Sequence, residues 1–330
     1  AEPLPFSGAT TATLAGAIIL SSPNNSSNYF GQWASPNNLI PYTAGKVYRA
    51  NWVLSTDQTQ PASVPSVRFR LSAGADNICV SSLQVNPGLT ASNEPAVAPA
   101  TTIYAQYFQP VDLAVLQSDP SVSGLKANFD IIDFSTNQSG ALTLDSVTFE
   151  ALDPPTLSTS DVSVTTINAS EWNFSGGATL FPSWQSASGT GFGTESFQIG
   201  VLDTQDNVVG MLSTESADSP PSVFPTQGQL YKATFGLSVG ASDDRSNEPR
   251  VRLRILDSNF EMSSSYDIMS RQGGLAMPNT TTTNYDVYMV GGNDSSSPRL
   301  DAGVDVIAFG LGEAGTINVD QLDIVHGNQP

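Results

Sequence analysis

The stretch VRFRL at residues 67–71 recurs as VRLRI at residues 251–255. Each copy alternates an apolar residue with an arginine. Alternation with a period of two is typical of a β-strand whose two faces meet different surroundings. The two stretches therefore predict equivalent strands. Val67, Phe69 and Leu71 point inward in the first strand, and the arginines of both strands point outward.

Four further blocks recur in the same order in the two halves of the chain. The pairs are GKVYRANWVLS (45–55) with GQLYKATFGLS (228–238), YAQYF (104–108) with YDVYM (285–289), LKANFDIIDF (125–134) with LDAGVDVIAF (300–309), and GALTLDSVTF (140–149) with GTINVDQLDI (315–324). Ordered self-similarity of this kind indicates a duplicated structural unit. We predict domain 1 over residues 1–152, a linker over 153–159 and domain 2 over 160–330.

Both halves consist of short alternating apolar blocks separated by clusters of Ser, Asn, Pro and Gly, which is typical of β-strands and turns. The chain's 22 prolines and 27 glycines disfavour long helices. Strand parity places Trp52 and its counterpart Phe235 in the core, and the setting of the single cysteine, Cys79, is that of a buried apolar residue. We predict an all-β fold of two tandem antiparallel jelly-roll β-sandwich domains.

Composition excludes several classes of partner. The 330 residues carry 31 acidic and 12 basic side chains, for a net charge of −19. This balance argues against nucleic acid and anionic lipid, which both require clustered Lys and Arg. No apolar run reaches the roughly 18 residues that suggest a membrane span. The many carboxylates are instead suitable ligands for Ca²⁺.

The uncharged polar surface is more typical of extracellular proteins than of cytosolic enzymes. The chain begins at Ala1 without an initiator methionine, so we expect that a signal peptide has been removed. N-glycosylation triplets are frequent and fit a secreted glycoprotein. The candidate acceptors are Asn24, Asn25, Asn137, Asn168, Asn173, Asn279 and Asn293. These features together predict an extracellular or cell-surface location.

The order of the blocks resembles a known family. FSGATTATL (6–14) and WNFSGGATL (172–180) precede a Gly-x-x-Tyr strand, then the R-x-R strand, and finally the closing strand with its aspartate. This order is similar to that of jelly-roll carbohydrate-binding modules and galactose-binding-like domains. The resemblance implies a structural Ca²⁺ with Asp145 and Asp320 among its ligands. The alternative is a strand-end aspartate that bonds nearby backbone amides.

The arginine strands have two interpretations. Arg68, Arg70, Arg252 and Arg254 could line a ligand groove, where guanidinium groups bind sugar hydroxyls or carboxylates. They could instead pair across strands with Asp130 and Asp305, which recur at equivalent positions. We favour pairing, because a requirement of the fold must recur in both copies and a binding site need not. Trp33 is a candidate platform for sugar stacking, although most such aromatic residues pack in the core.

Catalysis finds little support in the sequence. The one histidine, His326, has no associated nucleophile motif. A glycosidase would need two carboxylates about 5–10 Å apart, and no motif indicates such a pair. The uncharged β-capable segment at residues 8–20 is either the first strand of domain 1, which we favour, or a strand donated to a neighbouring subunit.

We therefore predict a non-catalytic extracellular structural protein, a self-associating subunit of a filament, sheath or surface layer assembled through β-edge contacts and Ca²⁺. The alternative is a carbohydrate-binding protein with two jelly-roll modules and a polysaccharide partner. A hydrolase with an unrecognised pair of carboxylates is the third hypothesis.

Overall fold

The structure is a computed structural model in which every described element is a β-strand. It describes residues 11–21, 31–36, 39–56, 66–73, 79–85, 100–110, 124–133, 141–157, 165–166, 173–175, 184–187, 197–202, 210–213, 226–239, 250–257, 262–268, 282–291, 300–308 and 314–330. No helix in these ranges is long and apolar enough to cross a membrane.

The strands form three antiparallel sheets, which confirms the predicted all-β, antiparallel sandwich fold. The first sheet has the order β1 (Thr11–Ser21), β9 (Ala141–Leu152), β4 (Val47–Thr56), β7 (Ala100–Phe108). The second has the order β12 (Trp184–Ala187), β13 (Phe197–Leu202), β20 (Ala314–Asn328), β15 (Gln229–Val239), β18 (Thr283–Val290), with β10 (Thr165–Thr166) also on β20.

The third sheet is the largest and contains strands from both halves of the chain. Its order is β11 (Asn173–Ser175), β14 (Gly210–Ser213), β19 (Leu300–Ala308), β16 (Arg250–Asp257), β17 (Met262–Ile268), β6 (Cys79–Val85), β5 (Ser66–Ala73), β8 (Gly124–Asp133), β2 (Gly31–Ala34), with β3 (Ile40–Pro41) also on β8. We call it the ten-stranded sheet.

The two halves repeat one strand order, as the paired sequence blocks predict. The path β1-β9-β4-β7 of the first half matches β13-β20-β15-β18 of the second, and β2-β8-β5-β6 matches β14-β19-β16-β17. The predicted boundary near residue 152 coincides with the end of β9, and residues 153–157 that follow are not in a strand. The domain limits themselves stay a prediction.

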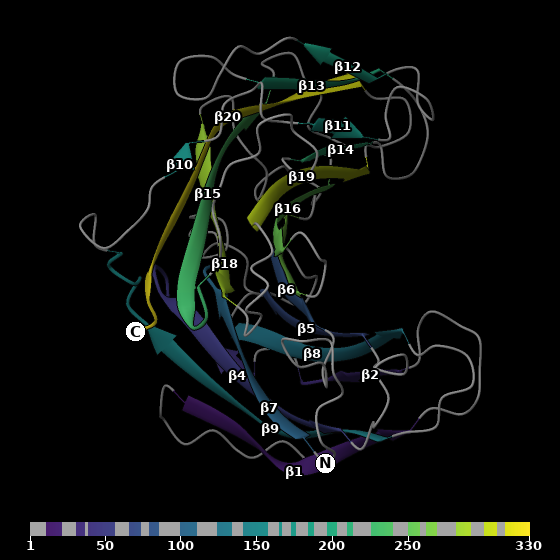
Figure 1. The fold of residues 1–330 in the computed structure, drawn as a ribbon, viewed down its shortest axis with the longest axis vertical. Coiled ribbons are helices and arrows are strands. Elements are labelled where there is room, and N and C mark those ends of the chain that lie inside the picture. The colour runs from purple at the N-terminus through teal and green to yellow at the C-terminus, as the bar shows by residue number, and fades with distance from the viewer. Residues whose placement is uncertain are drawn as a thin grey trace.

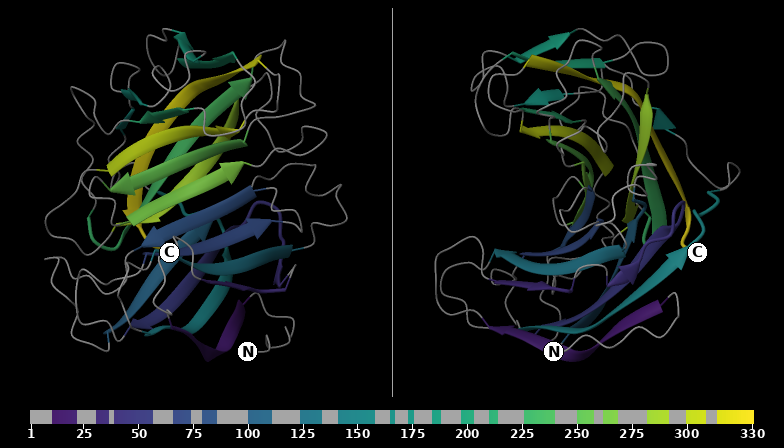
Figure 2. Two further views of the ribbon diagram at one scale, coloured as in Figure 1. Left: turned by 90° about the vertical axis from the view of Figure 1, so that its right-hand side faces the viewer. Right: turned by 180° about the vertical axis from the view of Figure 1, so that it is seen from behind.

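The junction of the halves is a pair of antiparallel strands in mid-sheet. Strand β6 pairs with β17, and Ser82 lies opposite its own repeat counterpart, Ser265. The junction is therefore close to two-fold symmetric. In the ribbon the molecule forms a C, with the ten-stranded sheet on the inner side and the two smaller sheets on the outer side (Figures 1 and 2).

One continuous core lies between the inner and outer layers and extends through both halves. Trp52 stacks on Phe69 with ring centroids 4.7 Å apart and meets Phe149 edge-on at 6.0 Å. Phe235, the counterpart of Trp52, is also fully buried, and so is Cys79. The positions that parity assigned to the core are therefore buried. The arginines of β5 and β16 lie on the opposite face of their strands, away from this core.

A second, smaller cluster closes the junction on the outer side of the C. Tyr107 on β7 and Tyr288 on β18 pack with ring centroids 6.4 Å apart, flanked by Val47 and Leu230. Both pairs are repeat counterparts, so this contact shares the near two-fold symmetry. The C-terminal segment adds polar contacts between the halves: Tyr107 Oη donates to Gln329 Oε1 at 3.1 Å.

Candidate functional site

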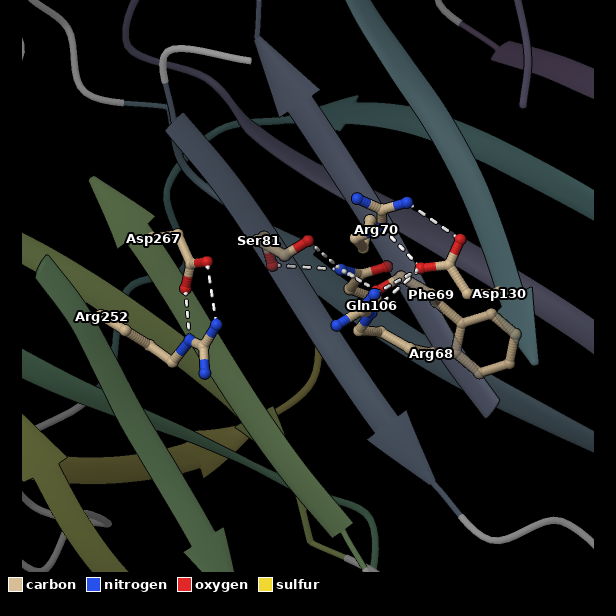
Figure 3. Close-up of polar contacts among 8 residues, drawn as sticks. All are labelled: Arg68, Phe69, Arg70, Ser81, Gln106, Asp130, Arg252 and Asp267. Atoms are coloured by element: carbon tan, nitrogen blue, oxygen red, sulfur yellow. Dashed lines mark hydrogen bonds and ion pairs between the residues drawn. The ribbon is translucent and has the colours of Figure 1, made fainter. Parts of the chain in front are cut away.

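The predicted arginine–aspartate pairing is present on the concave face of the first half. Asp130 on β8 is fully buried and lies directly across from Arg68 on β5. Arg68 Nε donates to Asp130 Oδ2 at 3.0 Å, and Arg70 Nη2 donates to Asp130 Oδ1 at 2.9 Å (Figure 3). Arg70 Nε lies 2.7 Å from Oδ2. One carboxylate therefore holds two guanidinium groups, and it connects β5 with β8.

The second half uses a different carboxylate. Arg252 on β16 pairs with Asp267 on the neighbouring strand β17, with Nε 2.9 Å from Oδ1 (Figure 3). Asp305, the expected partner, lies opposite Arg252 in the backbone register of β19, but its side chain lies outside the described residues. The pairing of Arg252 and Arg254 with Asp305 therefore stays a prediction. Asp267 was missed because its repeat counterpart is Gln84, so duplication gave no signal for it.

Each of these ion pairs links two neighbouring strands, and the arginine side chains are partly exposed to solvent. The side chains of Arg68 and Arg70 are 31% and 23% exposed, whereas Asp130 is inaccessible. Charged hydrogen bonds in a buried setting are stronger than neutral ones, so this cluster fixes the register of β5 on β8. The guanidinium faces that remain exposed could still contact an acidic or hydroxylated ligand.

Sequence reasoning also missed a buried polar bridge between the layers. Gln106 on β7 reaches across the core, and its Nε2 donates to the backbone oxygen and to Oγ of Ser81, each at 3.1 Å (Figure 3). Trp52 Nε1 donates to Gln106 Oε1 at 3.1 Å. Gln106 is only 2% exposed, and its counterpart is Val287. Its inward parity was readable from the strand pattern, but its partners lie on other strands and were not.

The two candidate calcium ligands occupy equivalent irregularities of the closing strands. The register of β4 on β9 shifts between Val53 and Leu54, which leaves Asp145 as the extra residue on β9. The register of β15 on β20 shifts in the same way and leaves Asp320 extra. The recurring aspartate therefore marks a β-bulge, where one strand carries an unpaired residue.

The carboxylate of Asp145 has a protein partner at this bulge. Ser55 Oγ donates to Asp145 Oδ2, and Ser55 Oγ lies 3.2 Å from Thr101 Oγ1. The side chain of Asp320 lies outside the described residues. Within the described part of the chain, no three His, Cys, Asp or Glu side chains gather as a metal site would require. Calcium binding stays a prediction.

The remaining candidate residues lie largely outside the described side chains. Trp33 is on β2 with its backbone opposite Phe129, and its side chain is not among those described. Asn173 is the first residue of β11, so this glycosylation candidate lies in a strand and not in a loop. The other glycosylation candidates, Asn24, Asn25, Asn137, Asn168, Asn279 and Asn293, lie outside the described residues.

The N-terminal segment forms an edge strand of its own half. Strand β1 pairs with β9 from Thr11 opposite Glu150 to Ser21 opposite Ala141, with a register shift between Ala15 and Ile18. This pairing confirms that the segment belongs to the sheet of its own half. Among the described strands β9 is its single neighbour, so one side of β1 is a sheet edge.

At the far end of the C, β12 and β11 are the outermost strands of their sheets (Figure 1). The strands at both ends, TATLAGAIILS, GQWA, NFS and WQSA, contain no charged residue. Sheet edges are usually protected from pairing with other chains by charged side chains, proline or short length. These four strands at the two ends of the C lack charges, whereas the edge strand β18 (Thr283–Val290) carries Asp286. Strand β1 is also long.

No protein-family model matches the chain, and no curated protein is similar to it in sequence. Among solved structures, a cyclase from Fischerella sp. TAU has a TM-score of 0.32 at 11% identity, over 53% of this chain and 93% of that one. A Stig cyclase from the same organism has a TM-score of 0.33 at 12% identity, over 53% and 94%. A peptide-N(4)-(N-acetyl-β-D-glucosaminyl) asparagine amidase has a TM-score of 0.22 at 8% identity, over 96% and 97%. None of these similarities assigns an activity to this chain.

Proposed function

We propose that the protein is a non-catalytic structural subunit of the cell exterior, which self-assembles into a filament, sheath or surface layer through the edges of its sheets. The observation that carries the proposal is strand β1. It spans Thr11–Ser21, contains no charge and no proline, and forms the edge of a sheet. An edge of this kind is a template for pairing with another chain.

The composition of the chain supports the same proposal. A net charge of −19 shows that acidic residues are plentiful, yet none lies in β1, β2, β11 or β12. Self-repulsion of the acidic surface opposes non-specific association, so contacts are favoured where charge is missing. The uncharged edges thus direct assembly to the two ends of the C.

The test is the mass of the purified chain in solution. Multi-angle light scattering over a concentration series and negative-stain imaging should show oligomers or filaments that grow with concentration. The measurements are made with calcium at about 1 mM and with a chelator, since extracellular calcium sites commonly bind in the millimolar range. A strictly monomeric protein in both conditions would disprove the proposal.

A calcium contribution is proposed at Asp145 and Asp320. Both sit at equivalent bulges, and a bulge presents backbone oxygens that hard cations accept as ligands. Isothermal titration with Ca²⁺, on the native protein and on an Asp145→Asn/Asp320→Asn variant, tests this. Equal heats from the two proteins would rule out these residues as ligands.

Carbohydrate binding is the second candidate function, and it rests on the partly exposed arginines of the concave face. Arg68 and Arg70 keep part of each guanidinium accessible while Asp130 orients them. A planar guanidinium donates hydrogen bonds to sugar hydroxyls and to carboxylates of acidic glycans. A glycan array should then show binding that Arg68→Gln/Arg70→Gln removes. Absence of binding at millimolar glycan would exclude this function.

A further inference from the structure

Equivalent strands β9 and β20 are covered differently in the two halves of the chain. In the first half, one strand, β1, pairs with β9 from Ala141 to Glu150. In the second half the same place on β20 is shared by β10, which lies opposite Asp323 and Ile324, and β13, which lies opposite Ile317 and neighbouring residues. Leu20 opposite Leu142 corresponds in register to Ile199 opposite Ile317, so β13 matches the C-terminal end of β1.

In the backbone register the residues between β10 and β13 have no counterpart in the first half, because Thr166 matches Thr13 and Phe197 matches Ile18. WNFSGGATL (172–180) therefore does not align with FSGATTATL (6–14), although the two segments are similar in sequence. Residues 14–17 suffice to continue β1 between the two matched positions, whereas residues 167–196 separate β10 from β13. Two described strands come from this longer connection. Strand β12 pairs with β13, and β11 pairs with β14, so each covers the edge of one sheet.

The register of the two halves shows which part of β1 corresponds to the part of β13 that β12 covers. Strand β12 places Ala187, Ser186 and Gln185 opposite Gln198, Ile199 and Gly200. These three residues of β13 correspond to Ile19–Ser21 of β1. Among the described residues no strand lies beyond Ile19–Ser21, and none lies beyond the outer side of β12. Within the described strands there is therefore an open edge at each end of the C, and the pairing of β12 with β13 indicates which kind of strand the matching edge of β1 accepts.

We propose that copies of this chain join head to tail, with β12 of one copy pairing with the Ile19–Ser21 edge of β1 of the next. This inference rests on the proposed function and specifies its contact. Both strands are uncharged, so no like charges meet where the two copies pair. The pairing makes one sheet continuous across copies, in the order β20-β13-β12-β1-β9.

The position of the two edges decides between a filament and a closed dimer. Strands β1 and β12 lie at opposite ends of the C (Figures 1 and 2). A contact between two different surfaces repeats without limit unless a rotation closes the ring. Pairing of β1 with β1 of a second copy would use one end only and would give a dimer, leaving the uncharged end at β12 without a partner.

The test uses variants that block one end each. Ile19→Lys/Ser21→Lys places charge on the β1 edge, and Gln185→Lys/Ala187→Lys places the same charge on β12. The matched control is Ser146→Lys/Thr148→Lys on β9, one strand in from the edge, where both side chains are partly exposed. All variants are expressed in a bacterial host, so that no N-glycan is attached to Asn173 on β11, which lies at the same end of the C as β12. Circular dichroism and thermal unfolding confirm that each variant is folded, and the single changes Ser21→Lys and Gln185→Lys repeat the test with less perturbation.

Light scattering should show the native chain and the control forming long assemblies, while each end-blocked variant alone has the mass of one chain. An equal mixture of the two end-blocked variants should reach the mass of two chains and stop. The unblocked β12 edge of one variant pairs with the unblocked β1 edge of the other, and the two ends that remain are both blocked. If the variant blocked at β12 forms dimers by itself, β1 pairs with β1 and the inference is wrong. If both variants assemble like the native chain, the edges of β1 and β12 are not the contact and the inference is wrong, although self-assembly stands. A monomeric native chain would overturn the proposed function as well.

Discussion

Replacing Asp130 with alanine should destabilise the protein far more than replacing a surface carboxylate in a pair of similar geometry. Asp130 is inaccessible and holds Arg68 and Arg70, with the shortest nitrogen–oxygen distance at 2.7 Å. Asp153 pairs with Lys46 at the same 2.7 Å, but its side chain is 88% exposed. The two substitutions remove equal charge, but Asp130 is buried and holds two guanidinium groups, whereas Asp153 is exposed and holds one ammonium group.

The expected loss in the free energy of unfolding follows from the two arginines that Asp130→Ala leaves without a counterion. Without Asp130, two guanidinium groups two residues apart on β5 lose their shared counterion and repel each other. Removing one partner of a buried ion pair costs about 3–5 kcal/mol. Because Arg68 and Arg70 are 31% and 23% exposed, part of their charge is rehydrated, and we expect about 3 kcal/mol for Asp130→Ala. For Asp153→Ala we expect less than about 1 kcal/mol.

Urea unfolding followed by tryptophan fluorescence measures both variants against the native chain. The two variants should share the native m-value and differ in midpoint, since the surface exposed on unfolding is unchanged. In the Arg70→Ala background the cost of Asp130→Ala should fall by about 1 kcal/mol or more, as coupled neighbours require. Equal destabilisation by Asp130→Ala and Asp153→Ala would refute the argument that burial gives the cluster its strength.

Three further predictions concern other parts of the fold. Gly291→Ala should destabilise the chain by more than about 2 kcal/mol in the same urea assay, because its new Cβ would overlap the backbone carbonyl of Thr226. Tyr107→Ala should cost about 3–5 kcal/mol and should split thermal unfolding into two calorimetric transitions, since Tyr107 packs on Tyr288 between the halves; a single transition would contradict that role. Stability should fall from about pH 10 to pH 12 in alkaline titrations. Burial raises the pKa of Tyr104 to about 12 and raises the pKa of Tyr107, so the unfolded chain releases these protons first; a flat profile would contradict this.

Strand identity and parity were predictable because they depend on local alternation. The inward positions of VRFRL and its neighbours gave the buried face, and the duplicated block gave Asp130 as the partner of Arg68 and Arg70. The partner of Arg252 was not predictable. Asp267 replaces the glutamine that stands at the equivalent position of the first half, so the repeat carried no information about it.

The joining of the halves was not predictable for a different reason. Repeats indicate which strands are equivalent, but they do not say whether edge strands of the two copies meet. The pairing of β6 with β17 depends on two edges with complementary backbone spacing and with small residues, Ser82 and Ser265, at the crossing. Similarly, the bulges at Asp145 and Asp320 arise from a one-residue mismatch between strands that lie far apart in the sequence.

The β6–β17 pairing has a consequence for the biosynthesis of the chain. When β6 leaves the ribosome its partner has not yet been made, and at about 5–20 residues per second the wait for β17 lasts on the order of ten to forty seconds. Throughout that interval the nascent first half presents a second open strand, and neighbouring ribosomes on one message present the same strand. Whatever shields β6 during translation, whether a chaperone or slow closure of the first half, therefore decides how much of the protein matures as single chains.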